Sequence, residues 1–83
     1  MTVPLELLRA DYIADGRAMT CPGPLLLTKR SIDRVDVGQI LEVQVTDQGA
    51  REDLPAWAKK SGNEYIGSLA REGFESHFLL RRK

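Results

Sequence analysis

Cys21 is the only cysteine in the sequence and the residue best suited to covalent chemistry. It is followed by Pro22, Gly23 and Pro24, and an apolar run begins at Leu25. A residue before proline is pushed away from helical angles, so this segment should be stiff and extended until a helix starts at the second proline. Unpaired N–H groups and partial positive charge at a helix start favour a thiolate over a thiol. Cys21 is therefore a candidate nucleophile.

The alternative for a lone cysteine is a buried thiol that packs as a small hydrophobe, because free cysteine is among the most buried residue types. The two prolines after Cys21 argue against this alternative, although prolines are common at helix starts. One cysteine excludes a disulfide within the chain and a cysteine-rich metal site. The single histidine, His77, is far away in sequence, so we expect no metal site.

The other residues that could take part in catalysis or ligand binding are better explained by structural roles. His77 is expected on the solvent face of the last strand, as an ordinary surface residue. Trp57 has the helical spacing of a core residue rather than of a ligand platform. Glu52 and Asp53 are expected in the first turn of a helix, where acids suit the helix dipole. No catalytic triad order, glycine-rich phosphate loop or zinc-protease motif is present.

The elements that must position Cys21 follow from hydrophobic periodicity and turn residues. The sequence predicts strands over 9–14, 40–46, 64–71 and 74–81, a helix over 24–35, and a second helix opened by Asp47 and ended at Gly62-Asn63. Asp15-Gly16 should end the first strand, and Pro55 should either kink the second helix or mark its true start. The order β-α-β-α-β-β predicts an α/β (α+β) fold, a two-layer sandwich of a four-stranded mixed sheet with both helices on one face.

Length and charge limit the possible functions. With 83 residues the chain can form one small domain, expected over 9–83 after an N-terminal extension, 1–8. Twelve basic and twelve acidic residues balance, which is unlike a nucleic-acid binder. The tail 81–83 is expected to be solvated. No apolar run could span a membrane and no signal peptide is recognisable, so we expect a cytoplasmic protein with no membrane partner.

Around Cys21 the sequence resembles the TusA/SirA-like family of small sulfur carriers. The hallmark of that family is Cys-Pro-x-Pro at the start of the first helix, which 21–24 matches. Asp15, six residues before the cysteine, also fits, whereas Ala18 stands where the family usually has glycine. Further similarities are Val37-Gly38, Thr46-Asp47 and the stretch 51–55. The resemblance covers about residues 9–83.

The resemblance implies the same β-α-β-α-β-β fold and a sulfurtransferase-like carrier that needs no cofactor. Cys21 would accept sulfane sulfur, as a persulfide or thiosulfonate, from a cysteine desulfurase or a rhodanese-like donor. It would pass the sulfur to an acceptor protein, DsrE-like or similar, in tRNA thiolation, cofactor assembly or oxidative sulfur metabolism. Pro22, Gly23, Pro24 and Asp15 would support the motif and helix start. Lys29 and Asp47 would lie on the partner-binding surface.

Two other hypotheses fit the residues. The chain could be a regulatory or redox-sensing interaction module, in which case Cys21→Ser keeps its partners and function. It could also be an anion-binding domain that uses the helix start, in which case affinity for sulfate or phosphate survives removal of the thiol.

Overall fold

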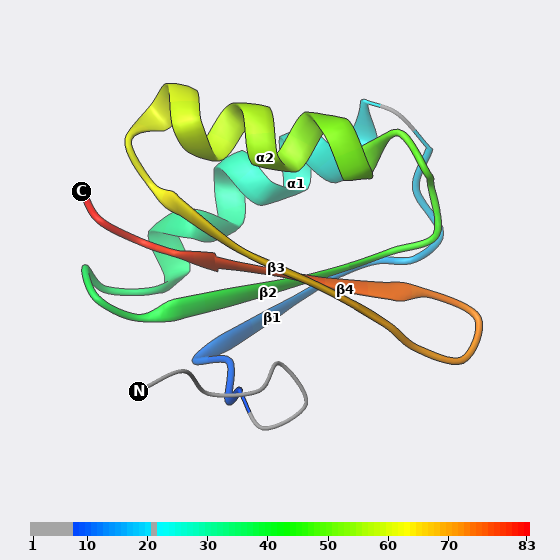
Figure 1. The fold of residues 1–83 in the computed structure, drawn as a ribbon, viewed down its shortest axis with the longest axis horizontal. Coiled ribbons are helices and arrows are strands. Elements are labelled where there is room, and N and C mark those ends of the chain that lie inside the picture. Colours follow the sequence, from blue (N-terminus) through cyan, green and yellow to red (C-terminus); the bar gives the residue numbers. More distant parts are fainter. Residues whose placement is uncertain (1–7, 21) are drawn as a thin grey trace.

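The computed structural model describes residues 8–20 and 22–83 (Figure 1). In chain order the elements are β1 (Tyr12–Gly16), α1 (Gly23–Ser31), a 3-10 turn η2 (Ile32–Arg34), β2 (Ile40–Val45), α2 (Ala50–Ser61), β3 (Glu64–Ala70) and β4 (Glu75–Leu80). The four strands form one mixed sheet, and both helices cover the same face of it. The predicted fold class and element order are confirmed.

The strand order places the loops that enter both helices along one edge of the sheet, the edge formed by the carboxyl ends of β1 and β2. The order is β1-β2-β4-β3, with β1 parallel to β2 and β4 antiparallel to both of its neighbours. Because β1 and β2 are parallel, their carboxyl ends lie together, and α1 and α2 both start there. Val45 at the end of β2 pairs with Glu75 at the start of β4. The loop that contains Cys21 therefore leaves the same edge at which α2 and β4 begin.

The core lies between the sheet and the helices. The side chains of Leu41, Val43 and Val45 are fully buried on the helix-facing side of β2. Thr28 in α1 and Val35, just after η2, are also buried. These contacts fix α1, and with it the start of the helix that follows Cys21.

The prediction that His77 lies on the solvent face is wrong. His77 is 0% exposed and pairs with Val43, which faces the helices. Phe78, on the opposite face, is also 0% exposed. In the central strand β4 the four residues from Ser76 to Leu79 are all buried, so alternation could not show which face was the core.

Two boundaries and the C-terminal tail also differ from the predictions. Asp15 and Gly16 are the last residues of β1 rather than a turn, because they pair with Gln44 and Val45 in the parallel ladder. The second helix begins at Ala50, so a start near Pro55 is wrong. The C-terminal tail is not simply solvated. The Arg81 guanidinium donates to the carbonyl oxygen of Val35 at 2.6 Å, and that of Arg82 donates to the carboxylate of Glu64 at 3.1 Å.

Candidate functional site

The segments on both sides of Cys21 form the turn that enters α1. Cys21 itself lies outside the described residues. The backbone N–H of Gly23 donates to the carbonyl oxygen of Thr20 at 2.7 Å, across the cysteine position. Three residues further on, the N–H of Leu26 donates to the carbonyl of Pro22 at 3.1 Å. The residues before and after Cys21 are thus joined by a tight turn that leads straight into the helix.

Two glycines allow close packing at the two ends of this loop. A Cβ atom on Gly23 would lie 2.9 Å from the Cβ of Met19, and one on Gly16 would lie 3.0 Å from the carbonyl oxygen of Gln44. Unstrained carbon contacts are about 3.5–4.0 Å. The variable position of Cys-Pro-x-Pro is therefore restricted to glycine by the space that Met19 leaves.

The start of α1 has no acidic group of its own. Its N-cap is Pro22, Pro24 lies in the first turn, and the helix has neither a side-chain cap hydrogen bond nor an acidic residue in that turn. The partial positive charge of the helix end is therefore not offset by a carboxylate of that turn. Such an environment lowers the pKa of a neighbouring thiol and stabilises a thiolate or a persulfide anion.

Side-chain contacts connect the segment before Cys21 to the rest of the edge. The Thr46 hydroxyl donates to the carbonyl oxygen of Arg17 at 2.6 Å. The Arg17 guanidinium donates to Asp15 at 2.9 Å and lies 5.5 Å from the centre of the Phe74 ring. This hydrogen bond lowers the pKa of Asp15. Asp15, which the family motif suggested as helix-start support, thus contacts Arg17, a residue of the loop.

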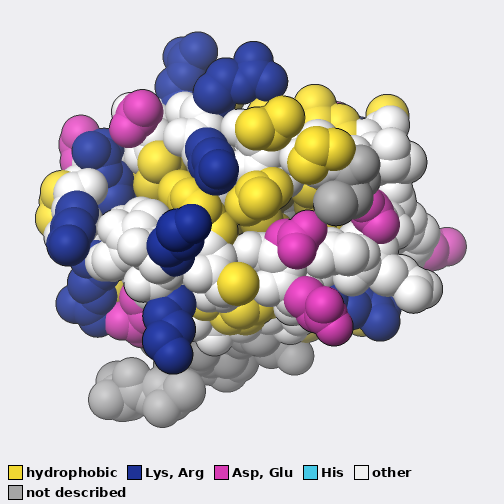
Figure 2. Space-filling view, turned by 90° about the horizontal axis from the view of Figure 1, so that it is seen from above, with side chains coloured by type: hydrophobic (Ala, Val, Ile, Leu, Met, Phe, Trp, Pro, Cys, Tyr) yellow, Lys and Arg dark blue, Asp and Glu magenta, His cyan; other side chains and the backbone are white. Residues whose placement is uncertain are grey.

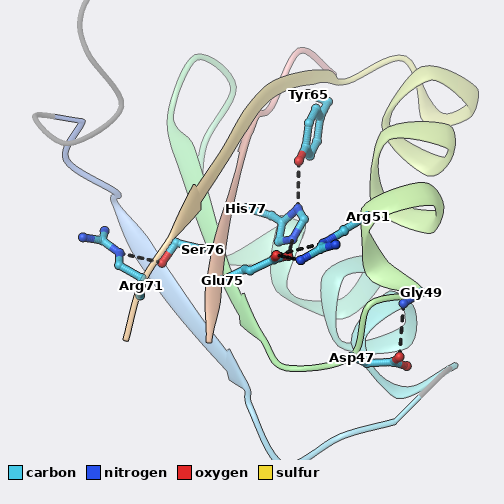
Figure 3. Close-up of polar contacts among 8 residues, drawn as sticks. All are labelled: Asp47, Gly49, Arg51, Tyr65, Arg71, Glu75, Ser76 and His77. Carbon is cyan, nitrogen blue, oxygen red and sulfur yellow. Dashed lines mark hydrogen bonds and ion pairs between the residues drawn. The ribbon is translucent and has the colours of Figure 1, made fainter. Parts of the chain in front are cut away.

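Asp47 and Lys29, the two predicted partner-binding residues, lie in different places. The Asp47 carboxylate accepts from the N–H of Gly49 at 3.1 Å, which shapes the turn before α2 (Figure 3). Gly49, and not Asp47, is the N-cap of that helix. Lys29 is exposed in the last turn of α1 and lines a groove between the helices. Asp47 therefore belongs to the edge with the cysteine loop, and Lys29 to the helical face.

A series of hydrogen-bonded side chains that the sequence did not indicate runs from the exposed Arg51 at this edge to the buried His77 (Figure 3). Arg51 donates to Glu75 through Nε at 2.8 Å, and the second oxygen of Glu75 lies 3.2 Å from His77 Nε2. His77 Nδ1 lies 2.8 Å from the hydroxyl of Tyr65. No motif marks these residues, which come from α2, β4 and β3.

The surroundings of these hydrogen-bonded side chains determine which of them carry a proton. Burial lowers the pKa of His77, so the imidazole is neutral at pH 7. A neutral ring that donates from Nε2 to Glu75 accepts at Nδ1 from the Tyr65 hydroxyl, which satisfies both contacts. The hydrogen bond from Arg51 lowers the pKa of Glu75, and burial raises the pKa of Tyr65. These hydrogen bonds therefore connect the start of α2 to strands β4 and β3.

The described part of the chain shows neither a metal-binding cluster nor a membrane-spanning helix. Among residues 8–20 and 22–83, no three His, Cys, Asp or Glu side chains gather closely enough to hold a metal ion. Over the same residues, no helix has the length and apolar character that crossing a bilayer requires.

Fold and site together define a small two-layer α/β domain whose only cysteine lies two residues before the first residue of its first helix. The family model described as Sulfurtransferase TusA matches residues 12–82, which is nearly all of the chain. The chain belongs to the TusA family of sulfur carriers.

Individual relatives agree with this assignment. The sulfur carrier protein TusA of Allochromatium vinosum is 38% identical over 72 residues, which cover 87% of this chain and 93% of that protein. YrkF of Bacillus subtilis is 37% identical over 75 residues, or 90% of this chain, but the chain spans only 40% of its length. The crystal structure of a SirA-like protein from Desulfitobacterium hafniense has the same fold, with a TM-score of 0.67, 20% identity, and coverage of 87% of this chain and 99% of that one.

Proposed function

We propose that this protein carries sulfane sulfur on Cys21 and relays it from a donor protein to an acceptor protein. The observation that carries the proposal is the family match over residues 12–82, within which Cys21 is the only cysteine. The start of α1 supports it, because the partial positive charge of a helix end stabilises an anionic sulfur and no carboxylate of the first turn offsets that charge.

The transfer is a nucleophilic displacement at sulfur. The Cys21 thiolate attacks the outer sulfur of a donor persulfide, R–S–SH, and the donor leaves as the thiolate R–S⁻. Cys21–S–SH is formed, the broken S–S bond is replaced by a new one, and no net oxidation occurs. An acceptor thiolate then attacks the outer sulfur in the same way and releases Cys21 as a thiolate.

The finer assignments belong to the same proposal. The donor would be a cysteine desulfurase or a rhodanese-like protein, and the acceptor a DsrE-like or similar protein, with both steps in the cytoplasm. Residues 9–83 would form the carrier domain. Asp47, at the edge with the cysteine loop, would contact these partners.

Intact-protein mass spectrometry tests the proposal directly. The protein is incubated with thiosulfate, tetrathionate or polysulfide, and separately with a persulfidated cysteine desulfurase, beside the variant Cys21→Ser. We expect an adduct of one or more sulfur atoms, or of thiosulfonate, on the wild type alone, and its loss after reduction. If no donor forms an adduct, or if Cys21→Ser forms the same adduct, the carrier proposal is wrong.

A further inference from the structure

A groove lies between α1 and the edge strand β1, and the sulfur chemistry proposed above does not use it. Its volume is about 460 Å³, which is within the usual range for small-molecule pockets. We call it the β1 groove, and its lining residues are Tyr12, Met19, Leu27, Arg30, Ser31 and Arg34. It shares no lining residue with the groove between the two helices, so the two are separate sites on the surface.

The apolar end of the β1 groove lies beside the cysteine loop. A Cβ atom on Gly16, the last residue of β1, would lie 3.1 Å from the Leu27 side chain and 3.9 Å from the Met19 sulfur. A Cβ atom on Gly23 would lie 3.5 Å from the same sulfur. Met19, two residues before Cys21, therefore forms part of the groove wall and also packs against the turn that enters α1.

The other end of the β1 groove is basic. Arg30 in the last turn of α1 and Arg34 in η2 are exposed, and neither forms an ion pair with another described residue. Asp33, the acidic residue between them, lies 4.0 Å from Arg81 instead. Figure 2 shows basic side chains gathered over one half of the helical face, beside apolar ones. An anion at this end would therefore meet two guanidinium groups that no ion pair neutralises within the described residues.

Ser31 supplies a polar group between these two ends of the groove. It follows Leu27 by about one helical turn, is 5% exposed, and lines the groove. Its hydroxyl forms no hydrogen bond with a described residue, whereas the Thr28 hydroxyl donates to the carbonyl oxygen of Pro24 at 2.8 Å. Every fully buried side-chain oxygen or nitrogen of the described residues has a partner, so the Ser31 hydroxyl is reached through the groove. A ligand oxygen there would satisfy a donor that the protein leaves unpaired.

We propose that the β1 groove binds a small organic carboxylate with an apolar body, and that its occupation slows the reactions of Cys21. The carboxylate lies between the two arginines, which suit its planar shape, and accepts a hydrogen bond from Ser31. The apolar body packs against Leu27 and Met19. Because Met19 also packs against the turn that enters α1, a ligand that holds Met19 restricts the cysteine loop and lowers the rate at which the thiol reacts.

Methionine signals in NMR spectra report on ligand binding in the groove. The chain has two methionines, Met1 and Met19, so isotope labelling of the methionine methyl groups gives a simple spectrum in which Met19→Leu identifies the Met19 signal. The probe is octanoate, beside acetate, which lacks the apolar body, and 1-octanol, which lacks the charge. We expect octanoate to shift the Met19 signal with a dissociation constant of about 1 mM or below, as its size allows. Acetate and 1-octanol should bind about tenfold more weakly, or worse.

Charge removal inside and outside the groove gives matched variants. Arg30→Gln and Arg34→Gln should each weaken octanoate binding about twofold to fivefold, which is the range for an exposed ion pair. Lys59→Gln removes the same charge from the last turn of α2, outside the groove, and should change binding by less than about twofold. Ser31→Ala should weaken binding about twofold to tenfold, through loss of one hydrogen bond to a charged group. It should leave the Tm unchanged or higher, since no hydrogen bond within the described residues is lost and alanine favours helices.

The effect on Cys21 is measured as the rate at which iodoacetamide alkylates its thiol, followed by intact-protein mass spectrometry. Saturating octanoate should lower this rate at least about twofold, because the rate depends on access to the thiol. Alkylation needs no persulfide, so the result does not depend on whether Cys21 carries sulfur.

Several outcomes would overturn the inference. An unshifted Met19 signal, or equal effects of Lys59→Gln and Arg34→Gln, would show that the groove is not a carboxylate site. A Tm lowered by Ser31→Ala would assign that hydroxyl to the fold rather than to a ligand. Tighter binding of octyl phosphate than of octanoate would replace the carboxylate with a phosphate. An alkylation rate that octanoate leaves unchanged would refute the coupling between the groove and Cys21.

Discussion

Gly23→Ala tests whether the shape of the cysteine loop depends on the space beside Met19. The added Cβ would lie 2.9 Å from the Met19 Cβ, so the helix start or the loop must move. Overpacking of this kind destabilises the fold by about 1–3 kcal/mol. Replacing a glycine also stabilises the fold by up to about 1 kcal/mol, because the unfolded chain loses conformational freedom. We expect a net loss of about 1–2 kcal/mol in the free energy of unfolding, which lowers Tm by about 5–15 °C in a domain of this size.

The measurement combines thermal unfolding, followed by circular dichroism, with the rate at which polysulfide modifies Cys21. We expect both the Tm and the rate to fall, because the displaced residues flank the cysteine. Gly49→Ala is the matched control: it also changes a glycine at a helix start, but its Cβ would lie 3.6 Å from the nearest atom, in Asp47. The φ of Gly49, −59°, suits alanine, so the Gly49→Ala variant should be as stable as the wild type or more stable. Equal melting temperatures for the two variants would refute the packing argument.

Two further predictions concern the contacts of the edge. Thr46→Val removes the hydroxyl that donates to Arg17, which should cost about 1 kcal/mol by urea denaturation and alter the polysulfide reaction rate of Cys21. The lowered pKa of His77 means that the unfolded chain binds its proton more readily, so stability should fall as pH drops below the ordinary value of 6.5. His77 can change the free energy of unfolding by at most about 1.4 kcal/mol per pH unit.

Each of these predictions has its own control. Thr46→Ser keeps the hydroxyl and should react at the wild-type rate; an equal loss in Thr46→Ser and Thr46→Val would contradict the role of the hydrogen bond. For His77, urea denaturation between pH 7.5 and 5 is compared with His77→Gln, whose curve should be flatter. Parallel curves for the two proteins would show that His77 is not the group responsible.

Much of the fold could be predicted because local signals agreed with one another. The period-two alternation predicted the strand over 40–46, which is β2, and the helical periodicity predicted the helix over 24–35, of which 24–31 lie in α1. The position of Cys21 before the first helix followed from Pro22 and Pro24 alone. These signals act over one or two turns of chain, which is the range that periodicity can report.

The rest depended on contacts between distant parts of the chain. His77 is buried because β4 lies between β2 and β3, and strand order cannot be obtained from the alternation of one strand. The Arg51–Glu75 contact joins residues 24 positions apart, and the Thr46–Arg17 bond joins residues 29 apart. The groove between the helices that Lys29 lines is likewise formed only when α1 and α2 pack side by side.

The ladder between β2 and β4 has a consequence for how the chain folds. The segment from β1 to β2 is one unit built from neighbours in sequence, and the β3–β4 hairpin is a second. The antiparallel ladder between 40–45 and 75–80 joins the two units and completes the sheet. Loop closure over that separation is slow relative to helix or hairpin formation. The ladder should therefore form late in folding and, on the same path in reverse, open early in unfolding. The cysteine loop lies entirely within the first unit, so its local geometry can be assembled before the sheet is complete.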